Sequence, residues 1–100
     1  MKFVDSVEAR ELCLYAENSS DVYFRSIIPA MRTIEKHVKR GNFDREKAID
    51  AFYHVADYAA RAYCKEFGGD FSRVFDVTAR FSAACMLFNG NEESIISGDF

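Results

Sequence analysis

The chain has 100 residues, and its 16 acidic and 13 basic side chains give a formal net charge of −3 at pH 7. This length is that of one small domain, and a slightly acidic balance gives little nonspecific affinity for nucleic acid. No run approaches the roughly 20 apolar residues of a membrane span, and no secretory signal pattern is present. We therefore expect a soluble, cytoplasmic protein with no membrane contact.

The first expected helix follows a lead-in from Met1 to Val4. Asp5 and Glu8 form a capping-box pattern, and the helix ends near Asn18. Its apolar stripe consists of Ala9, Leu12, Cys13 and Ala16. Leu14 and Tyr15 fall outside this stripe, so we expect the helix to be covered on two sides.

A second helix is expected from the turn at 18–20 to about Arg40. Its core positions are Tyr23, Ile27, Met31, Ile34 and Val38. Pro29 lies inside it, where proline removes one backbone hydrogen bond and clashes with the preceding turn. We therefore predict a kink or break near Ser26, or two shorter helices in its place. Gly41 closes this segment.

The stretch from Phe43 to Gly69 predicts the helix around which the chain is packed. Asp44 is a good N-cap, and Gly68 with Gly69 supplies a left-handed stop. A helix of about 22 residues would span roughly 33 Å, the width of a small domain. Its predicted buried face consists of Ala48, Phe52, Val55, Ala56, Ala59, Ala60, Tyr63 and Phe67.

A short turn of helix is expected near Val74, capped by Asp70 or Ser72. Asp76 then caps the last expected helix, which ends at Asn89 and Gly90. Residues 91–100 are predicted to form a loosely ordered acidic tail. The fold class is therefore all-α: one compact bundle of four to five helices, in a domain of residues 1–90, with a long central helix.

The chain resembles a group of small uncharacterised helical proteins encoded by bacteriophages, prophages and plasmids. The pattern that carries the resemblance lies between Ala9 and Arg80 and consists of Glu11-Leu12, Tyr15, Asn18, Tyr23, Pro29, Lys39-x-Gly41-x-Phe43-Asp44, Lys47-Ala48, Phe52, Ala60, Tyr63 and Glu66-Phe67. Where this chain has Gly41-x-Phe43-Asp44, the group commonly has Gly-x-Tyr-Asp, so the chain differs only in having Phe43 in place of tyrosine. No agreed activity comes with the group, so the resemblance implies only an accessory protein of a mobile element in a bacterial host.

Three polar residues of the central helix could carry chemistry. Asp50, His54 and Asp57 are spaced four and three residues apart, so one histidine and two carboxylates could face the same side and hold a divalent metal. The alternative, which we favour, is a solvated face on which Asp57 pairs with Arg61. We expect no metal and no cofactor. The three cysteines, Cys13, Cys64 and Cys85, have no CxxC spacing and are expected to be reduced and buried.

The second half of the second helix carries a basic patch, which consists of Arg32, Lys36, Lys39 and Arg40. Such a patch could contact phosphates of a nucleic acid or an acidic partner. Cations near a helix C-terminus also complement the helix dipole while remaining solvated, and we favour this interpretation. A nucleic-acid-associated regulator is therefore the alternative function.

Spare aromatic and apolar side chains suggest a surface for a partner. Tyr53 and Tyr58 fall between the two faces of the central helix. Met86 and Leu87 lie outside the apolar stripe of the last helix, which consists of Val77, Phe81, Ala84, Cys85 and Phe88. These residue types are enriched at interface cores, although a small domain could also bury all four. The partner is a host protein or a second copy of the chain in a homodimer.

Our working hypothesis is a non-enzymatic accessory that binds a host protein, such as a defence component, and inhibits or redirects it. A metal-dependent helical enzyme built on Asp50 and His54 is the least favoured alternative.

Overall fold

A computed structural model of the chain describes residues 6–98 and residue 100. The expected lead-in at 1–4 and the expected cap at Asp5 lie outside the described residues. The helical elements in chain order are α1 (Val7–Asn18), α2 (Ser20–Val22), η1 (Tyr23–Ile27), α3 (Ile28–Lys39), α4 (Arg45–Phe67), α5 (Phe71–Val74) and α6 (Val77–Ser97). No strand occurs among the described residues, so the predicted all-α class is confirmed.

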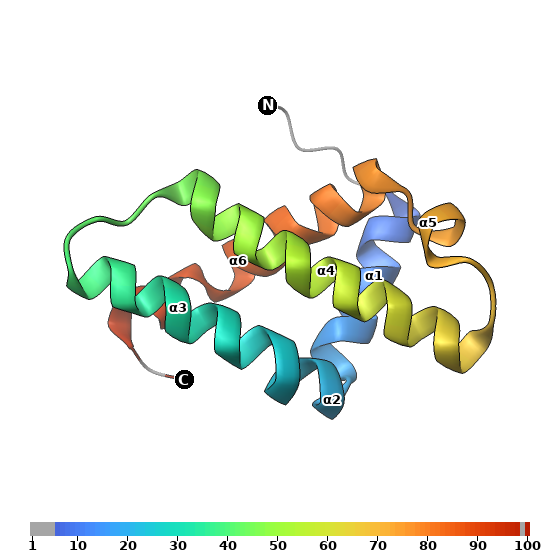
Figure 1. Cartoon of the computed structure of the whole chain (residues 1–100), viewed down its shortest axis with the longest axis horizontal. Coiled ribbons are helices and arrows are strands. Elements are labelled where there is room, and N and C mark those ends of the chain that lie inside the picture. Colours follow the sequence, from blue (N-terminus) through green and yellow to red (C-terminus); the bar gives the residue numbers. More distant parts are fainter. Residues whose placement is uncertain (1–5, 99) are drawn as a thin grey trace.

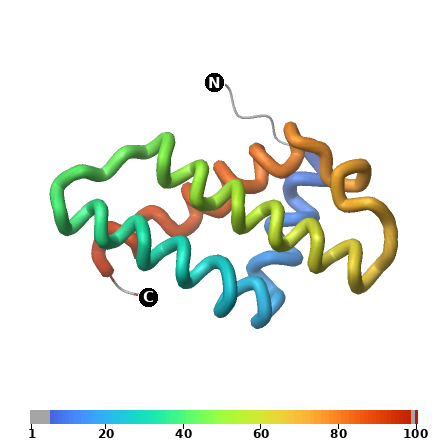
Figure 2. Tube along the Cα trace, in the orientation of Figure 1, coloured from blue at the N-terminus to red at the C-terminus, as the bar shows by residue number. Residues whose placement is uncertain are grey.

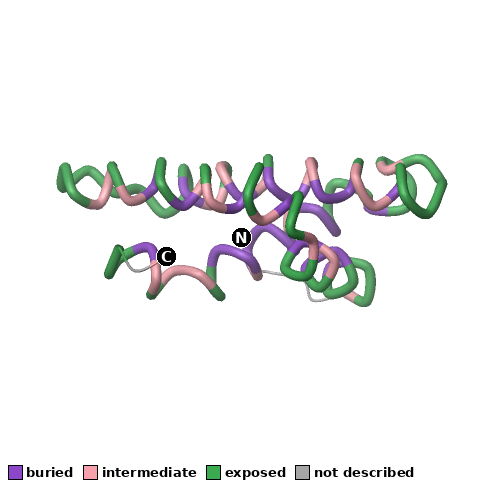
Figure 3. Tube along the Cα trace, turned by 90° about the horizontal axis from the view of Figure 1, so that it is seen from below, coloured by how far each residue is buried: buried purple, intermediate pink, exposed green. Residues whose placement is uncertain are grey.

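Helix α4 is the centre of the molecule, as the sequence predicts, because each of the other elements packs against it. The domain measures 41 × 30 × 15 Å along its principal axes. Helices α3 and α4 lie side by side in one layer, with α6 and α1 in a second layer behind them (Figure 1). The buried parts of the two layers face each other (Figure 3). The core therefore consists of the side chains packed between the two layers of helices.

Small residues bring α4 and α6 close together at the middle of this core. Ala56, Ala59 and Ala60 of α4 have no exposed surface, and neither do Ala83 and Ala84 of α6. Toward the N-terminal end of α4 larger rings fill the space, since the ring centroids of Phe52 and Phe88 lie 6.0 Å apart. The alanines of the predicted face therefore let α6 approach the central helix closely.

Side-chain caps fix where the helices begin. Asp44 accepts from the backbone N–H of Glu46, and Asp76 accepts from that of Ala79, as predicted. Asp70, rather than Ser72, caps α5. The first helix begins differently from the expected capping box at Asp5, because Ser6 is the N-cap of α1 and accepts from Ala9.

Before Pro29, where the sequence predicts a kink or break near Ser26 or two shorter helices, the structure has the π-helical segment η1 and no break. The N–H of Ile28 donates to the carbonyl of Tyr23, five residues earlier. In a regular α-helix the Pro29 ring would clash with the carbonyl of Arg25 and leave it without a donor. A π-turn moves that carbonyl away, and helical conformation continues from Ser20 to Lys39 without a break. Along the longest axis of the molecule, the turn from α3 to α4 lies at one end and the α5 segment lies toward the other end (Figure 2).

The predicted stop at Asn89–Gly90 is wrong, and so is the loosely ordered tail. Helix α6 continues to Ser97, and Ile95 within the expected tail is 1% exposed. The C-cap is Gly98, whose φ of 74° places it in the left-handed region. Gly90 is therefore a glycine in the middle of a helix.

Replacing Gly90 with alanine is expected to stabilise the protein by about 0.5–1 kcal/mol, because alanine loses less conformational freedom in a helix than glycine. A Cβ at Gly90 meets nothing within 4 Å. Gly98→Ala is the matched control and should destabilise by about 1–2 kcal/mol, owing to its left-handed backbone. Its Cβ would also lie 2.7 Å from Oε2 of Glu35. Urea unfolding of both variants measures the difference, and a destabilised Gly90→Ala would place the helix end at Gly90 after all.

Candidate functional site

The two tyrosines predicted to bind a partner are half-buried and already make internal contacts. The hydroxyl of Tyr58 donates to Asp21 Oδ2 at 2.9 Å, which ties α4 to α2. The ring of Tyr53 lies 5.7 Å from the guanidinium of Arg80. Tyr53 also lines a shallow depression with Ile49 and other side chains of α4 and α6. The structure therefore gives the two rings different neighbours.

Met86 and Leu87, the other two residues predicted to contact a partner, differ in exposure. Leu87 has no exposed surface, so the prediction that it contacts a partner is wrong. Met86 is half-buried, and its Sδ lies 3.5 Å from the thiol of Cys13 on α1. Helix α6 packs against α1, α3 and α4, and this enclosure buries residues outside its predicted stripe.

The expected trio on the polar face of α4 does not converge on a metal. Asp50 and His54 are exposed, whereas Asp57 is half-buried and accepts from two arginines. Among the residues that the structure describes, no group of three or more His, Cys, Asp or Glu side chains is placed to hold a metal ion. The predicted pairing of Asp57 with Arg61 is present, at 3.1 Å.

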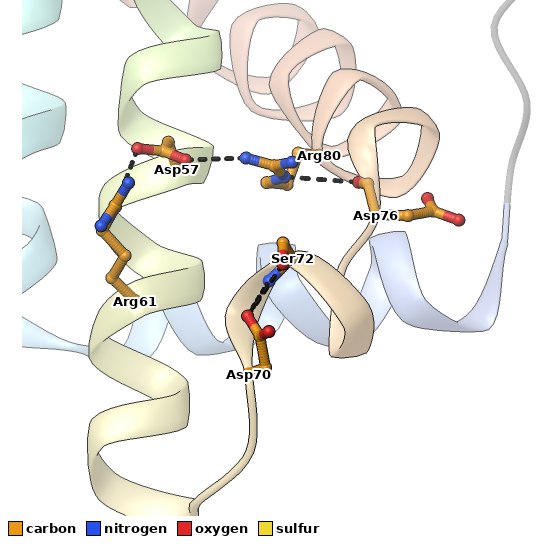
Figure 4. Close-up of polar contacts among 6 residues, drawn as sticks. All are labelled: Asp57, Arg61, Asp70, Ser72, Asp76 and Arg80. Atoms are coloured by element: carbon orange, nitrogen blue, oxygen red, sulfur yellow. Dashed lines mark hydrogen bonds and ion pairs between the residues drawn. The ribbon is translucent and has the colours of Figure 1, made fainter.

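Asp57 has a second partner that the sequence pattern does not indicate, the buried Arg80 of α6. Nη1 of Arg80 lies 2.8 Å from Asp57 Oδ1, and its Nε donates to the carbonyl of Asp76 (Figure 4). Its guanidinium also lies 5.1 Å from the ring centroid of Phe71, which Arg61 approaches to 4.1 Å. This cluster joins α4, α5 and α6 and has a structural role.

The basic patch is exposed, and part of its charge is already balanced. Lys39 pairs with Glu35 at 3.6 Å, and the guanidinium of Arg32 lies 5.9 Å from the ring centroid of Phe100. Lys36 and Arg40 are exposed at the end of α3. Lys36, Lys39 and Arg40 therefore lie where cations complement the negative end of the α3 dipole, whereas Arg32 lies in the first half of the helix.

A different surface holds an open depression. It is a groove of about 650 Å³, here named the α1–α4 groove, between the second half of α1, the start of α2 and the C-terminal end of α4. These three segments lie on the same side of the molecule in Figure 1. Its lining residues are Glu11, Leu14, Tyr15, Asn18, Ser19, Ser20, Asp21, Tyr63, Glu66 and Phe67.

Two reciprocal hydrogen bonds hold the walls of the groove together. The hydroxyl of Tyr63 on α4 donates to Glu11 on α1 at 2.5 Å, and that of Tyr15 on α1 donates to Glu66 on α4 at 3.0 Å. Glu11 and Tyr15 are four residues apart, and Tyr63 and Glu66 are three apart, so each pair shares one face of its helix. The two walls are thus tied to each other by two side-chain hydrogen bonds.

An aromatic cluster forms the floor of the groove and connects it to the core. Tyr63 contacts the buried ring of Phe75, with centroids 5.0 Å apart. On its other side Tyr63 lies 4.7 Å from Phe67 and 5.2 Å from Tyr15. The outer members of the surface remain open to solvent, since Phe67 is 63% exposed and Leu14 is 60% exposed. A packed aromatic floor with exposed apolar edges is the kind of surface that can contact another protein.

The carboxylates of the groove perturb its tyrosines. The hydrogen bond to Glu11 is the main cause of a raised pKa at Tyr63, and partial burial adds to it. Burial is the main cause of the raised pKa of Tyr15, and the hydrogen bond to Glu66 and its charge act in the same direction.

Glu11→Gln is expected to move the pKa of Tyr63 down toward its ordinary value of 10.0 and to leave Tyr15 raised, since Tyr15 has its own partner. A raised pKa means that the folded chain holds the phenolic proton more tightly than the unfolded chain. This contribution to stability is therefore complete below about pH 10 and is lost as the pH rises further. NMR titration of the tyrosine ring resonances in both proteins tests this, and an unchanged Tyr63 would contradict the hydrogen bond.

The sequence contains two signals for this surface. Leu14 falls outside the apolar stripe of the first helix, which predicts that a second element covers it. In the structure the side chain of Leu14 is exposed instead. Phe67 is the last residue of α4 and continues the predicted buried face, yet the core ends before it. The groove was not predicted from the sequence, because its walls come from residues about fifty positions apart.

The fold and this surface define a two-layer all-α domain with an exposed aromatic groove between α1 and α4. No protein-family model, no curated protein and no solved structure matches the chain. In the part of the chain that the structure describes, no helix combines the length and apolar character needed to cross a membrane.

Proposed function

We propose that the protein is a non-enzymatic, protein-binding accessory and that its partner docks in the α1–α4 groove. The observation that carries this proposal is the exposure of Leu14 and Phe67 beside two tyrosine rings that are held in place by hydrogen bonds. Rigid aromatic side chains with exposed apolar neighbours are the anchors that contribute most of the energy of protein interfaces. Little ordering is required on binding, because the floor is already fixed.

The biological role that we propose for this binding is to inhibit or redirect a host protein on behalf of a bacterial mobile element. A defence component is one such target. The mobile-element context and the bacterial cytoplasm as the place of action come from the sequence resemblance, whereas the groove supplies the surface.

The test is affinity capture of the tagged protein from nuclease-treated bacterial lysate, with variants that change the groove alone. Leu14→Ser combined with Phe67→Ser removes the apolar edges of the groove. Val77→Ser combined with Ile96→Ser is the matched control, because these side chains are equally exposed, at 62% and 59%, and lie outside the groove. All four sites are exposed enough that each change should alter stability by no more than about 0.5 kcal/mol.

We expect one stoichiometric protein to be captured by the wild type and the control and lost from the groove variant. A partner that the groove variant retains would overturn the assignment of the surface. Partners that disappear with nuclease would favour nucleic-acid association through the basic patch. Capture of nothing specific by any form would contradict the protein-binding function itself.

A further inference from the structure

The free charge of the α1–α4 groove is carried by two carboxylates at its walls. Of its three acidic lining residues, Asp21 is already paired with Arg25 at 3.1 Å and with the hydroxyl of Tyr58. Glu11 and Glu66 each accept one tyrosine hydroxyl, and neither forms an ion pair with any described residue. No lysine or arginine is among the ten lining residues. The groove therefore presents uncompensated negative charge beside the exposed ring of Phe67.

Elsewhere this chain combines a carboxylate and an aromatic ring to hold an arginine. Arg61 pairs with Asp57 while its guanidinium lies 4.1 Å from the ring centroid of Phe71. Arg45 pairs with Glu92 at 2.9 Å while lying 5.0 Å from the centroid of Phe88. Guanidinium groups suit such places because they bind carboxylates in a planar fork and stack on ring faces.

We infer that the α1–α4 groove receives an arginine-bearing segment of the partner, with the guanidinium between the carboxylates of Glu11 and Glu66 and the exposed ring of Phe67. This inference rests on the protein-binding function proposed above. Each glutamate has a second carboxylate oxygen beyond the one that accepts the tyrosine proton, and that oxygen can accept from the incoming guanidinium. Leu14 contacts an apolar neighbour of the arginine. Charge complementarity selects arginine over acidic or purely apolar segments.

The experiment selects short random peptides from a displayed library on the immobilised wild-type protein. It then measures the affinity of synthetic copies by fluorescence anisotropy. We expect the selected peptides to carry arginine next to leucine or an aromatic residue, and to bind more weakly as salt is raised. Replacing that arginine with citrulline, which keeps the shape and removes the charge, should weaken binding about tenfold.

The matched protein variants assign this effect to the groove. Glu11→Gln combined with Glu66→Gln should weaken the arginine peptide by about tenfold and make the arginine and citrulline peptides bind equally. Glu17→Gln combined with Glu93→Gln is the control, since both side chains are exposed and outside the groove. Circular dichroism of each variant confirms that the fold is retained.

Each remaining outcome overturns the inference in a distinguishable way. Peptides that require Leu14 and Phe67 but bind equally well with citrulline would remove the arginine and leave the protein-binding function standing. A selection without any peptide that depends on these two residues would show that the groove takes no partner segment. A concentration-dependent dimer that Leu14→Ser with Phe67→Ser abolishes in sedimentation equilibrium would assign the groove to a second copy of the chain.

Discussion

Leu87→Ala is expected to lower the free energy of unfolding by about 2–5 kcal/mol, which is the range for removing a fully buried leucine and leaving a cavity. Leu87 has no exposed surface and belongs to the core cluster between the two layers. Neighbouring helices enclose this position, so the core cannot collapse easily around the missing atoms. For a domain of this size such a loss is a large fraction of the total stability.

The control for this prediction is Leu14→Ala, which removes the same atoms from a side chain that is 60% exposed. Its effect should stay within about 0.5 kcal/mol. Urea unfolding followed by circular dichroism measures both variants. If the two leucines showed similar small effects, Leu87 would have to be a surface residue and could again be considered for partner binding.

Arg80→Ala is expected to destabilise the protein by about 3 kcal/mol. The variant loses a charged hydrogen bond to the half-buried Asp57, of a kind worth about 1.5–3 kcal/mol, and a longer one, of 3.4 Å, to the carbonyl of Asp76. It also loses the stacking of the guanidinium on Phe71 and Tyr53. The remaining partner of Asp57 is Arg61, which limits the cost of leaving this carboxylate half-buried.

Arg61→Ala is the matched control, because Arg61 contacts the same Asp57 and the same Phe71 from a side chain that is 63% exposed. Solvent screening should limit its effect to about 1 kcal/mol and make it sensitive to salt. The effect of Arg80, whose side chain is 10% exposed, should change little with salt. Equal losses for the two variants would contradict the structural role of the buried pair.

The parts of the fold that follow from local rules were predictable from the sequence. Asp44 and Asp76 cap their helices through backbone groups two or three residues away, so neighbouring residues alone determine these ends. The irregularity before Pro29 is equally local, because the proline ring acts on its own preceding turn. Helical periodicity then placed the alanines of α4 in the core.

The predictions that failed depend on where other helices begin and end. Gly90 suggests the end of a helix. However, α6 continues to Ser97, and this extension buries the side chain of Ile95 in the core. Leu14 and Leu87 both lie outside the stripes of their helices and have opposite environments, because α6 is enclosed by its neighbours and the outer side of α1 is not. Periodicity gives a direction around one helix and says nothing of what lies in that direction.

The groove could not be predicted for the same physical reason, although each of its residues can be located on its own helix. Tyr63 and Phe67 were placed on a buried face, and Tyr15 was placed outside one. Only the crossing of α1 over the end of α4 makes them one aromatic floor.

The π-helical segment before Pro29 has a consequence for the groove. Each residue of a helix advances the chain by about 100° around the axis, so one residue more or fewer within 23–27 rotates everything before it by that angle relative to α3. Asp21, Ser20 and Ser19 line the groove on the far side of this segment. Deleting one residue there would turn these side chains, with the α1 wall attached to them, out of phase with α4. Pro29 is exposed and lies outside the groove. Through the π-helical segment before it, Pro29 thus affects how the two walls of the groove are rotated relative to each other.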